Sequence, residues 1–307
     1  QFGFHIDATT QDDIRAQTPH LLDTSMERVR DELFKLLGLG KPGAALRVAD
    51  RLGLLTVIIP ELAPLHGLQQ RSPHVHDAWN HTLAVVDNLH AILTVISPRR
   101  TDSTAAQFNL GMIAVALDRF RTPLQAHFES VGPDERAHRA LLLLAALLHD
   151  IGKAIVTPVP DASGQPRFRG HEAAGADAAL ERAEALRLSR AEIDRVVALV
   201  RYHMGSALWV DELTPLVIYR YWKLLGDGGI DLIMLTLADY LGAVGARLDQ
   251  DQWLTLVERA QTLLQAYYEQ RDQLVDPPSL INGSQLMRIL GLPPGPAVGD
   301  LLERIRE

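Results

Sequence analysis

Apolar residues recur along most of this chain with the spacing of an amphipathic helix, at positions i, i+3, i+4 and i+7. The alternating, β-branched pattern of a strand is almost absent. The pattern therefore predicts an all-α fold. The expected helices cover residues 11–22, 25–37, 42–52, 78–97, 104–117, 135–150, 172–186, 190–203, 214–225, 229–246, 250–273 and 284–290.

Glycine and proline mark the breaks between these helices. They gather at residues 38–40, 72–73, 98, 158–166, 226–229, 277–278 and 293–296. The stretch from Thr157 to Gly170, which contains DASGQPRFRG, is expected to be the longest loop near the HDIGK motif discussed below. Loops of that length are often functional, because a rigid scaffold can present binding side chains on them.

The composition is that of an ordinary globular protein, with 47% hydrophobic and 22% charged residues among 307 and a net charge of −8. A net negative chain does not attract nucleic acid through its overall charge, so contact with RNA would need a local basic face. Such a face is offered, with acidic residues interleaved, by Arg28, Arg30, Lys35, Arg47 and Arg51. No apolar run approaches the ~20 residues that span a bilayer, so a soluble protein without membrane contact is expected.

The chain contains no cysteine, which excludes disulfides, thiolate catalysis and cysteine-ligated zinc. Histidine, aspartate and glutamate remain as strong metal ligands. The absence of cysteine also makes the cytoplasm the expected location. The sequence opens with QFGFHID, which reads like the interior of a folded protein and indicates that further sequence precedes it.

The segment LLLLAALLHDIGK, residues 141–153, places His149 and Asp150 directly after eight residues without a polar side chain. An aspartate buried without a partner is costly, and the partial negative charge at a helix C-terminus favours a cation over another anion. A basic side chain, a hydrogen-bond network or a metal ion must therefore compensate. A second pair, His76-Asp77, lies in a polar stretch where Asp77 is expected to cap the next helix.

Further ligand-type residues stand on apolar or small-residue faces of the expected helices, where core residues would otherwise lie. Taken singly, each has an ordinary interpretation, because a lone buried histidine is usually hydrogen-bonded and a lone aspartate is usually paired with arginine or lysine. Together they favour one metal centre. The full set is His81, His149, Asp150, His171, His203 and Asp239.

Part of this set would suffice for one ion, namely His81, His149, Asp150 and Asp239. The remaining two histidines could hold a second ion, with the Asp150 carboxylate as a bridge. Two ions about 3.5 to 4 Å apart would clamp a phosphoryl group and activate a water molecule. Such ligands suit Mn, Fe, Co, Ni and Zn, and Mg less well.

The order H…HD…H…H…D resembles the HD-domain superfamily of metal-dependent phosphohydrolases. The resemblance implies a multi-helical HD-domain bundle in which the four residues His81, His149, Asp150 and Asp239 are the basic ligand set. It also implies that the extra His171 and His203 belong to a two-metal site. Lys153 of HDIGK matches a position near the bound phosphate.

A narrower resemblance covers almost the whole chain. The segments that carry it are QFGFHIDATTQDDI, SMERVRDELFKLL, LLTVIIPELAPLHGLQQ, HDAWNHTL, RFRGHEAAGA and LINGSQLMRILGLPPGPAVGDLLERI. They resemble the part of bacterial tRNA nucleotidyltransferases of the poly(A) polymerase family that follows the catalytic head. This resemblance implies a neck-like helical segment over residues 1–70, an HD domain over 71–246 and a helical tail over 247–307, the tail on the tRNA-binding side.

The signature of that family for nucleotidyl transfer is a Gly-Ser or Gly-Gly loop with an Asp-x-Asp pair on a strand. Neither is recognisable in this chain. Asp249 and Asp251 have the spacing, but they lie in a charged, helical stretch and are interpreted as a solvated helix face. If the chain is complete as given, it is not expected to add nucleotides.

Two functional hypotheses follow. In the first, the protein is a metal-dependent phosphohydrolase that cleaves a phosphoester of a nucleotide or an RNA end. One or two divalent ions would be held around Asp150 and Asp239, and Asp239 could help to accept a proton from water. Lys153, Arg167 and Arg169 would orient the phosphate, although the two arginines could equally belong to a solvated loop.

In the second hypothesis, the chain is a non-catalytic tRNA- or RNA-binding portion of a nucleotidyltransferase-type protein, and its HD site is vestigial. The complete ligand set speaks against a vestige, because decay should remove ligands first. Asp150→Ala should abolish hydrolysis under the first hypothesis and leave RNA affinity unchanged under the second. The sequence does not indicate the metal, the leaving group or the oligomeric state.

Overall fold

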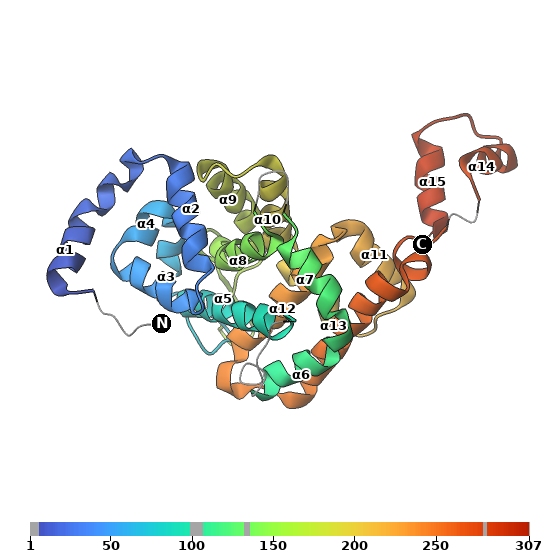
Figure 1. Ribbon diagram of the computed structural model, residues 1–307. Helices are drawn as coiled ribbons and strands as arrows, with labels where there is room; N and C mark the ends of the chain where they lie inside the picture. Colours follow the sequence, from blue (N-terminus) through green and yellow to red (C-terminus); the bar gives the residue numbers. More distant parts are fainter. Residues whose placement is uncertain (1–5, 99–106, 132–135, 279–280, 307) are drawn as a thin grey trace.

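The computed structural model describes residues 6–98, 107–131, 136–278 and 281–306, and it confirms the all-α fold (Figure 1). The helices are α1(Ala8–Gln17), α2(Met26–Leu37), α3(Pro42–Arg51), α4(Leu54–Ile58), α5(Ala78–Val95), α6(Phe108–Ala116), α7(Arg121–Glu129), α8(His138–Leu148), α9(His171–Ala185), α10(Arg190–Tyr202), α11(Pro215–Leu225), α12(Gly228–Val244), α13(Gln250–Glu269), α14(Gly283–Leu290) and α15(Pro296–Arg306).

Short helical turns connect several of these helices. The 3-10 turns are η1(Thr18–Asp23), η2(Pro60–Leu65), η4(Asp118–Phe120), η5(Ile151–Ala154), η6(His203–Gly205), η7(Ala207–Trp209) and η8(Gly245–Arg247). A π-helical turn, η9(Arg271–Val275), follows α13. The strands of the described residues are β1(Val159–Pro160) and β2(Pro166–Arg167), which pair antiparallel within the expected loop 157–170.

Most expected helices lie within a few residues of those observed, but α4, α7 and α15 were not predicted. Helix α4 has only five residues, too few to show a helical period. The sequence of α7, RTPLQAHFE, carries a proline and few apolar residues, and α15 contains Gly299. Residues 104–106, expected to begin a helix, lie outside the described residues, as does residue 135.

The core is built around α5, α8, α10 and α12, which pack against one another. Every residue of α8 from Leu141 to Leu148 is buried, as its uninterrupted apolar sequence predicts. Helices α5 and α12 approach closely at Gly242, where an added Cβ would lie 2.7 Å from Cγ2 of Val85. This contact lies about one turn from His81 on α5 and from Asp239 on α12, so it holds these two side chains together.

The stretch Gly228–Arg247 is long and apolar enough to cross a membrane, contrary to the expectation that no run of the chain approaches that length. Within the protein, 83% of its most apolar window is buried. The reason is its place in the fold, since α12 is surrounded by α5, α8, α10, α11 and α13. A helix that is apolar on all sides is typical of such a central position.

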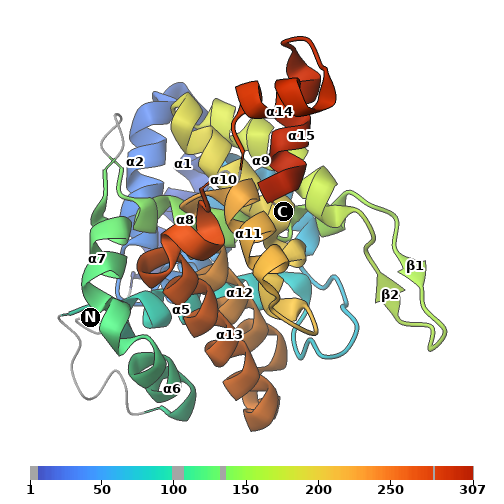
Figure 2. The same cartoon turned by 90° about the vertical axis from the view of Figure 1, so that its right-hand side faces the viewer.

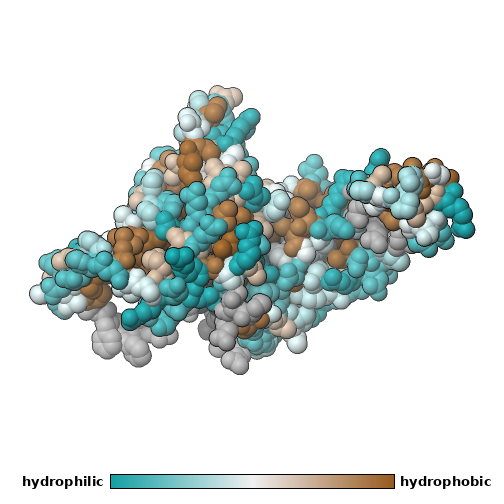
Figure 3. All heavy atoms as spheres, turned by 90° about the horizontal axis from the view of Figure 1, so that it is seen from above, coloured by the Kyte–Doolittle hydropathy of each residue, from teal (hydrophilic) through white to brown (hydrophobic). Residues whose placement is uncertain are grey.

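The N-terminal helices α1 to α4 lie at one end of the molecule, and α14 with α15 projects from the other (Figures 1 and 2). Ion pairs join the N-terminal part to the core: Arg182 contacts Glu61 at 2.7 Å, and Arg136 contacts Asp31 at 3.0 Å. Seen from above, the surface is largely hydrophilic with separate apolar patches, one of them on the C-terminal helices (Figure 3).

Candidate metal centre

The HD motif lies at the buried C-terminal end of α8. His149 and Asp150 are 0% and 1% exposed, and the chain turns directly afterwards into η5. Gly152 permits this turn to lie against the start of α9, because a Cβ there would collide with the carbonyl oxygen of His171 and the backbone of Gly175. This close contact at Gly152 brings His171 to Asp150.

The Asp150 carboxylate lies between two pairs of histidines. Its Oδ2 is 3.4 Å from Nε2 of His81 and 3.3 Å from Nε2 of His149. Its Oδ1 is 3.4 Å from Nε2 of His171 and 3.7 Å from Nε2 of His203. One oxygen therefore faces each pair, which is the geometry expected of a bridging carboxylate.

Asp239 completes the first half of this central site, which we define as His81, His149, Asp150, His171, His203 and Asp239. Its Oδ1 is 3.0 Å from Nε2 of His81 and 3.8 Å from Nε2 of His149. Within each half the imidazoles converge, with Nε2 to Nε2 distances of 3.4 Å between His81 and His149 and 3.2 Å between His171 and His203. The potential ligand atoms of each half lie within 4.8 Å of one another.

Backbone carbonyls fix the orientation of three of these imidazoles. Nδ1 of His149 is 2.8 Å from the oxygen of Ala146, and Nδ1 of His203 is 2.7 Å from the oxygen of Val200. Nδ1 of His171 is likewise 2.7 Å from the oxygen of Phe168. Because a carbonyl only accepts, each Nδ1 carries the proton and each Nε2 offers a lone pair toward Asp150. This donor set fits divalent metal ions.

The electrostatic environment favours the anionic forms of both carboxylates and the neutral form of His203. Burial would also lower the pKa of His149, but the neighbouring Asp150 outweighs burial and raises that pKa. Burial alone would raise the pKa of Asp150, but His149 and Lys153 outweigh it and hold that pKa well below its usual range. Burial likewise opposes ionisation of Asp239, and the contact with His81 lowers its pKa nonetheless. Burial, with His149 nearby, lowers the pKa of His203 to about 4. Anionic carboxylates and neutral imidazole are the forms that bind metal.

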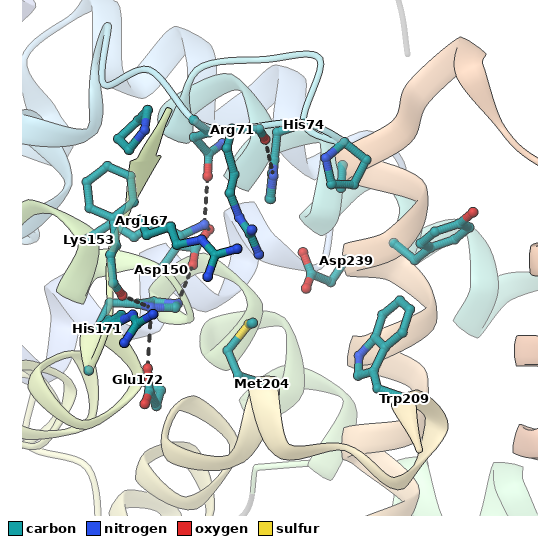
Figure 4. Close-up of a pocket in the computed structure, with 18 of the residues that line it drawn as sticks. Arg71, His74, Asp150, Lys153, Arg167, His171, Glu172, Met204, Trp209 and Asp239 are labelled. Atoms are coloured by element: carbon teal, nitrogen blue, oxygen red, sulfur yellow. Dashed lines mark hydrogen bonds and ion pairs between the residues drawn. The ribbon is translucent and has the colours of Figure 1, made fainter. Parts of the chain in front are cut away.

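A pocket of about 590 Å³ opens above the central site (Figure 4). The three residues predicted to orient phosphate, Lys153, Arg167 and Arg169, all line it together with Asp150 and Asp239. Nζ of Lys153 is 2.6 Å from both Oδ2 of Asp150 and Oε1 of Gln70. The structure thus brings every predicted site residue to one place, while their roles stay predictions.

Several pocket residues were missed by the sequence analysis. Arg71 and His74 come from the segment RSPHVHD before α5, and the His74 ring packs edge-on against His81 with 4.8 Å between the centroids. On the opposite wall, Met204, Trp209 and Tyr240 were also missed. These residues follow His203 and Asp239 closely in sequence, and that proximity is the signal that could have indicated them.

Two stretches with aspartate were predicted to have no catalytic role, one at Asp77 and the other at residues 249–251. Asp77 caps α5, because its side chain accepts a hydrogen bond from the backbone nitrogen of Asn80 at 2.8 Å. Asp249 caps α13 in the same way, and Asp251 is exposed in its first turn. The interpretation of residues 249–251 as a solvated helix face is confirmed.

A second group of ligand-type residues lies away from the pocket, between α7, α8, α10 and α12. We call it the Arg195 cluster: His127, His138, Arg195, Asp227 and Asp231. The guanidinium of Arg195 is 2.7 Å from Asp231 and 3.1 Å from Nδ1 of His138, while Nε2 of His127 is 3.0 Å from Asp231. The guanidinium of Arg195 already supplies a positive charge to this cluster, and one nitrogen of each ring is engaged, so the cluster is a polar network and unsuited to a cation.

Two family models match the chain. Residues 3–65 match the model described as a probable RNA- and SrmB-binding site of polymerase A, and residues 107–243 match the HD domain. The N-terminal part and the central part of the chain thus resemble two different families. His81 precedes the matched range of the HD domain, although α5 places it at the same site.

Relatives support the resemblance to tRNA nucleotidyltransferases. An A-adding tRNA nucleotidyltransferase from Deinococcus radiodurans is 30% identical over 284 residues, or 92% of this chain and 54% of the relative. A CC-adding tRNA nucleotidyltransferase from Thermus thermophilus is 31% identical over 281 residues, or 92% of this chain and 52% of the relative. The chain thus spans about half the length of these relatives.

A third relative matches a smaller share of the chain. A bifunctional uridylyltransferase/uridylyl-removing enzyme from Ruegeria pomeroyi is 31% identical over 189 residues, which is 60% of this chain and 17% of the relative. The predicted resemblance of this chain to the neck and HD portion of the tRNA nucleotidyltransferase family is confirmed.

Proposed function

We propose that this chain is a metal-dependent phosphohydrolase that cleaves a phosphoester of a nucleotide or of an RNA end. The observation that carries the proposal is the bridging position of Asp150. One carboxylate oxygen faces His81 and His149 and the other faces His171 and His203, on the floor of a pocket lined by cationic side chains.

The central site would hold one or two divalent ions, with Mn, Fe, Co, Ni or Zn suited to these ligands better than Mg. When bound, such ions supply Lewis acidity and an activated water for attack on phosphorus. Asp150 and Asp239 provide the negative charge that holds the ions. The lowered pKa of Asp239 suits it as a ligand and makes it a weak base, so its part in accepting a proton is secondary.

The cationic side chains of the pocket would bind the phosphate. Arg167 lies on the β1–β2 hairpin and Arg71 on the segment before α5, and both extend into the pocket (Figure 4). Arg169, which follows the hairpin, also lines the pocket. Lys153 is 8% exposed and contacts Asp150 directly, so it would neutralise this carboxylate as well as face the phosphate. Guanidinium groups suit phosphate oxygens because they donate in pairs.

The similarity to known proteins supports this choice of reaction class. One relative is named a uridylyl-removing enzyme, and removal of a nucleotidyl group breaks a phosphoester bond. The RNA-binding segment at residues 3–65 supports an RNA or tRNA partner. We retain the division into a neck-like segment 1–70, an HD domain 71–246 and a tail 247–307 as part of the proposal, together with a cytoplasmic location.

The alternative, an RNA-binding portion with a vestigial HD site, is less well supported. All six candidate ligands are present, and at least three of them have the backbone contacts that orient an imidazole for metal binding. A site without function would have no need of these contacts.

The test is turnover of a 2′,3′-cyclic nucleotide and a nitrophenyl phosphodiester by metal-stripped protein supplied with Mn, Ni, Co or Mg. We expect metal-dependent hydrolysis that Asp150→Ala lowers by more than about 100-fold, since even the residues that support a metal ligand are worth 10- to 100-fold. Asp239→Asn, which preserves shape, should have a similar effect.

Asp251→Ala is the matched control, because this exposed aspartate lies outside the pocket. Circular dichroism of each variant verifies that the fold is kept. Absence of turnover with every metal, together with tRNA affinity that Asp150→Ala leaves unchanged, would overturn the proposal in favour of the RNA-binding alternative.

A further inference from the structure

The pocket above the central site has two chemically different ends. One end carries the side chains of Arg71, Lys153, Arg167 and Arg169. The other is formed by Met204, Trp209, Tyr240 and Gln252, none of which is charged. In Figure 4, Arg71 and Arg167 extend toward Asp150 from one side, and Trp209 stands on the other side of Asp239.

Trp209 differs from the other tryptophans of the chain. Its side chain is 41% exposed, whereas Trp79, Trp222 and Trp253 are 3%, 2% and 0% exposed. An indole left open at the rim of a pocket costs apolar burial, so its position there calls for a reason. Tyr240 stands beside it, with 5.8 Å between the ring centroids.

The fold holds this aromatic wall in place. Trp209 ends the turn η7, which Ser206 caps through the backbone nitrogen of Leu208. Arg259 of α13 donates to the carbonyl oxygen of Leu208 at 2.9 Å and to that of Asp211 at 3.1 Å, so it fixes the chain on both sides of Trp209. The hydroxyl of Tyr240 donates to Oε1 of Gln252 at 2.8 Å, which orients its ring.

The wall is also fixed relative to the central site. Trp209 follows the candidate ligand His203 by one short turn, and Tyr240 directly follows Asp239. The separation between the aromatic wall and the metal ligands is therefore set by the same two segments that supply those ligands.

We propose that Trp209 and Tyr240 form a base-binding wall, so that the substrate of this site is a nucleoside phosphate whose base lies against Trp209 while its phosphate lies at the basic end. This inference rests on the proposed function, which supplies the reaction at the phosphate. It adds that the base is the part of the substrate that Trp209 and Tyr240 bind. Every nucleobase has a flat, apolar face that stacks on an aromatic side chain, whereas a sugar phosphate without a base has none. The pocket volume of about 590 Å³ lies within the usual range for small-ligand sites.

The charge distribution supports the same substrate. Within the described part of the chain, Arg71 and Arg169 have no carboxylate partner, so their guanidinium groups are open to an anion. A ligand that satisfies both ends must join an anionic group to a flat neutral group. A nucleotide has this composition, and inorganic phosphate does not.

The first test is binding, measured by tryptophan fluorescence and by calorimetry. The probes are a nucleoside 5′-monophosphate, ribose 5-phosphate, which lacks only the base, and inorganic phosphate. Each is titrated into metal-stripped protein and into protein supplied with Zn²⁺. Because Trp209 is the exposed tryptophan, we expect the nucleotide to quench fluorescence and ribose 5-phosphate to bind about 5- to 100-fold more weakly, the range covered by stacking of one base.

Variants then assign the effect to the wall. Trp209→Ala should lower nucleotide affinity about 5- to 100-fold and leave ribose 5-phosphate affinity unchanged, and Trp209→Phe should restore part of the loss. Phe108→Ala is the control, since Phe108 is 52% exposed and lies outside the pocket. Equal affinity for the two sugar phosphates, or equal losses for both in Trp209→Ala, would overturn the inference.

The outcomes separate this inference from the proposed function. Nucleotide binding that depends on Trp209, without metal-dependent turnover of any substrate, would support the base-binding wall and reject the hydrolase. Turnover that depends on Asp150 but is equal for nucleotide and ribose phosphate, with no effect of Trp209→Ala, would support the hydrolase and reject the wall.

Discussion

The central site and the Arg195 cluster both contain buried histidine and aspartate side chains, but different contacts stabilise these polar groups in the two regions. In the Arg195 cluster, the guanidinium lies 2.7 Å from Asp231 and supplies the positive charge that the carboxylates require. In the central site, the imidazole Nε2 atoms converge on Asp150, and backbone carbonyls bind the Nδ1 atoms of His149, His171 and His203. The Arg195 cluster contains its own positive charge, whereas the central site has ring nitrogens that could bind an ion.

The comparison shows that proximity of histidine and aspartate alone does not indicate a metal site. Both regions contain sets of three histidine and aspartate side chains whose ligand atoms lie within 4.8 Å of one another. The distinguishing features are which ring nitrogen is left as an acceptor, and what the neighbouring cation contacts: Arg195 contacts both Asp231 and His138, whereas Lys153 contacts Asp150 and Gln70. These features can be tested separately in the two regions.

The largest expected effect is on metal content. Asp150→Ala should lose all bound metal because its two oxygens face both histidine pairs, while His203→Ala should lose only the ion on its own side. Elemental analysis of purified protein after reconstitution measures the stoichiometry. The Arg195 cluster gives the matched control, His127→Ala, which should keep the full metal content. Equal metal loss in all three variants would show that the central site and the Arg195 cluster do not differ in metal binding.

The second effect is on stability. Asp231 is 0% exposed, and its removal takes away the buried carboxylate that contacts both Arg195 and His127. We expect Asp231→Ala to lower the free energy of unfolding by about 3–5 kcal/mol, with metal content per folded molecule unchanged. Denaturant unfolding measures the loss.

A double variant tests the same prediction even if Asp231→Ala does not fold. Replacing the pair with apolar residues, Asp231→Leu with Arg195→Met, should recover much of the stability, since a buried ion pair is often no more stabilising than apolar groups of similar volume. A single variant as stable as the natural chain would show that the cluster is not a closed network.

The third effect is on the close packing of η5 against α9 at Gly152. An alanine at position 152 would collide with the backbone at His171 and Gly175, so we expect a loss of about 1–3 kcal/mol in stability and weaker binding of the ion on the His171 side. Thermal unfolding and metal titration measure the two effects. Gly228→Ala is the control, because open space surrounds that position. Unchanged metal affinity in Gly152→Ala would show that this approach does not position His171.

The sequence was sufficient to predict that the residues of the central site lie together, because several of them interrupt apolar helix faces. His81, His149 and Asp239 each stand where burial would otherwise demand an apolar side chain, and such misplaced polar residues are conspicuous in a helical pattern. Asp231 also lies on the buried face of α12, but it was not predicted to belong to a site. It is part of the Arg195 cluster. The pattern shows that a polar residue is buried, but not which partner it has.

The substrate-binding part of the pocket could not be predicted in the same way. Arg71 lies in an irregular segment, and Trp209 lies in a three-residue turn, so neither belongs to a periodic pattern. Their approach to Asp150 depends on long-range packing between α5, α12 and α13. Helix α7 was missed for a related reason, since its few apolar residues give no clear period.

The smallest expected effect is the share of the pH dependence of stability that His138 of the Arg195 cluster contributes. Burial, with the adjacent charge of Arg195, lowers the pKa of His138 below its ordinary value of 6.5. The other groups that face His138 are His127 on α7 and Asp227 and Asp231 on α12, and Arg195 belongs to α10. The unfolded chain therefore binds a proton at this histidine at a higher pH than the folded chain does.

The sign follows from this difference. The contribution of His138 to stability is fully present above the unfolded pKa of 6.5, and it is lost as the pH falls through the lower folded value. Denaturant unfolding of metal-loaded protein between pH 7.5 and pH 5, roughly the range in which histidine titrates, should show decreasing stability. His138→Gln should make that decrease shallower while leaving metal content unchanged. An equally steep decrease in the variant would assign the pH dependence to groups outside this cluster, and the two regions would then no longer be separable by titration.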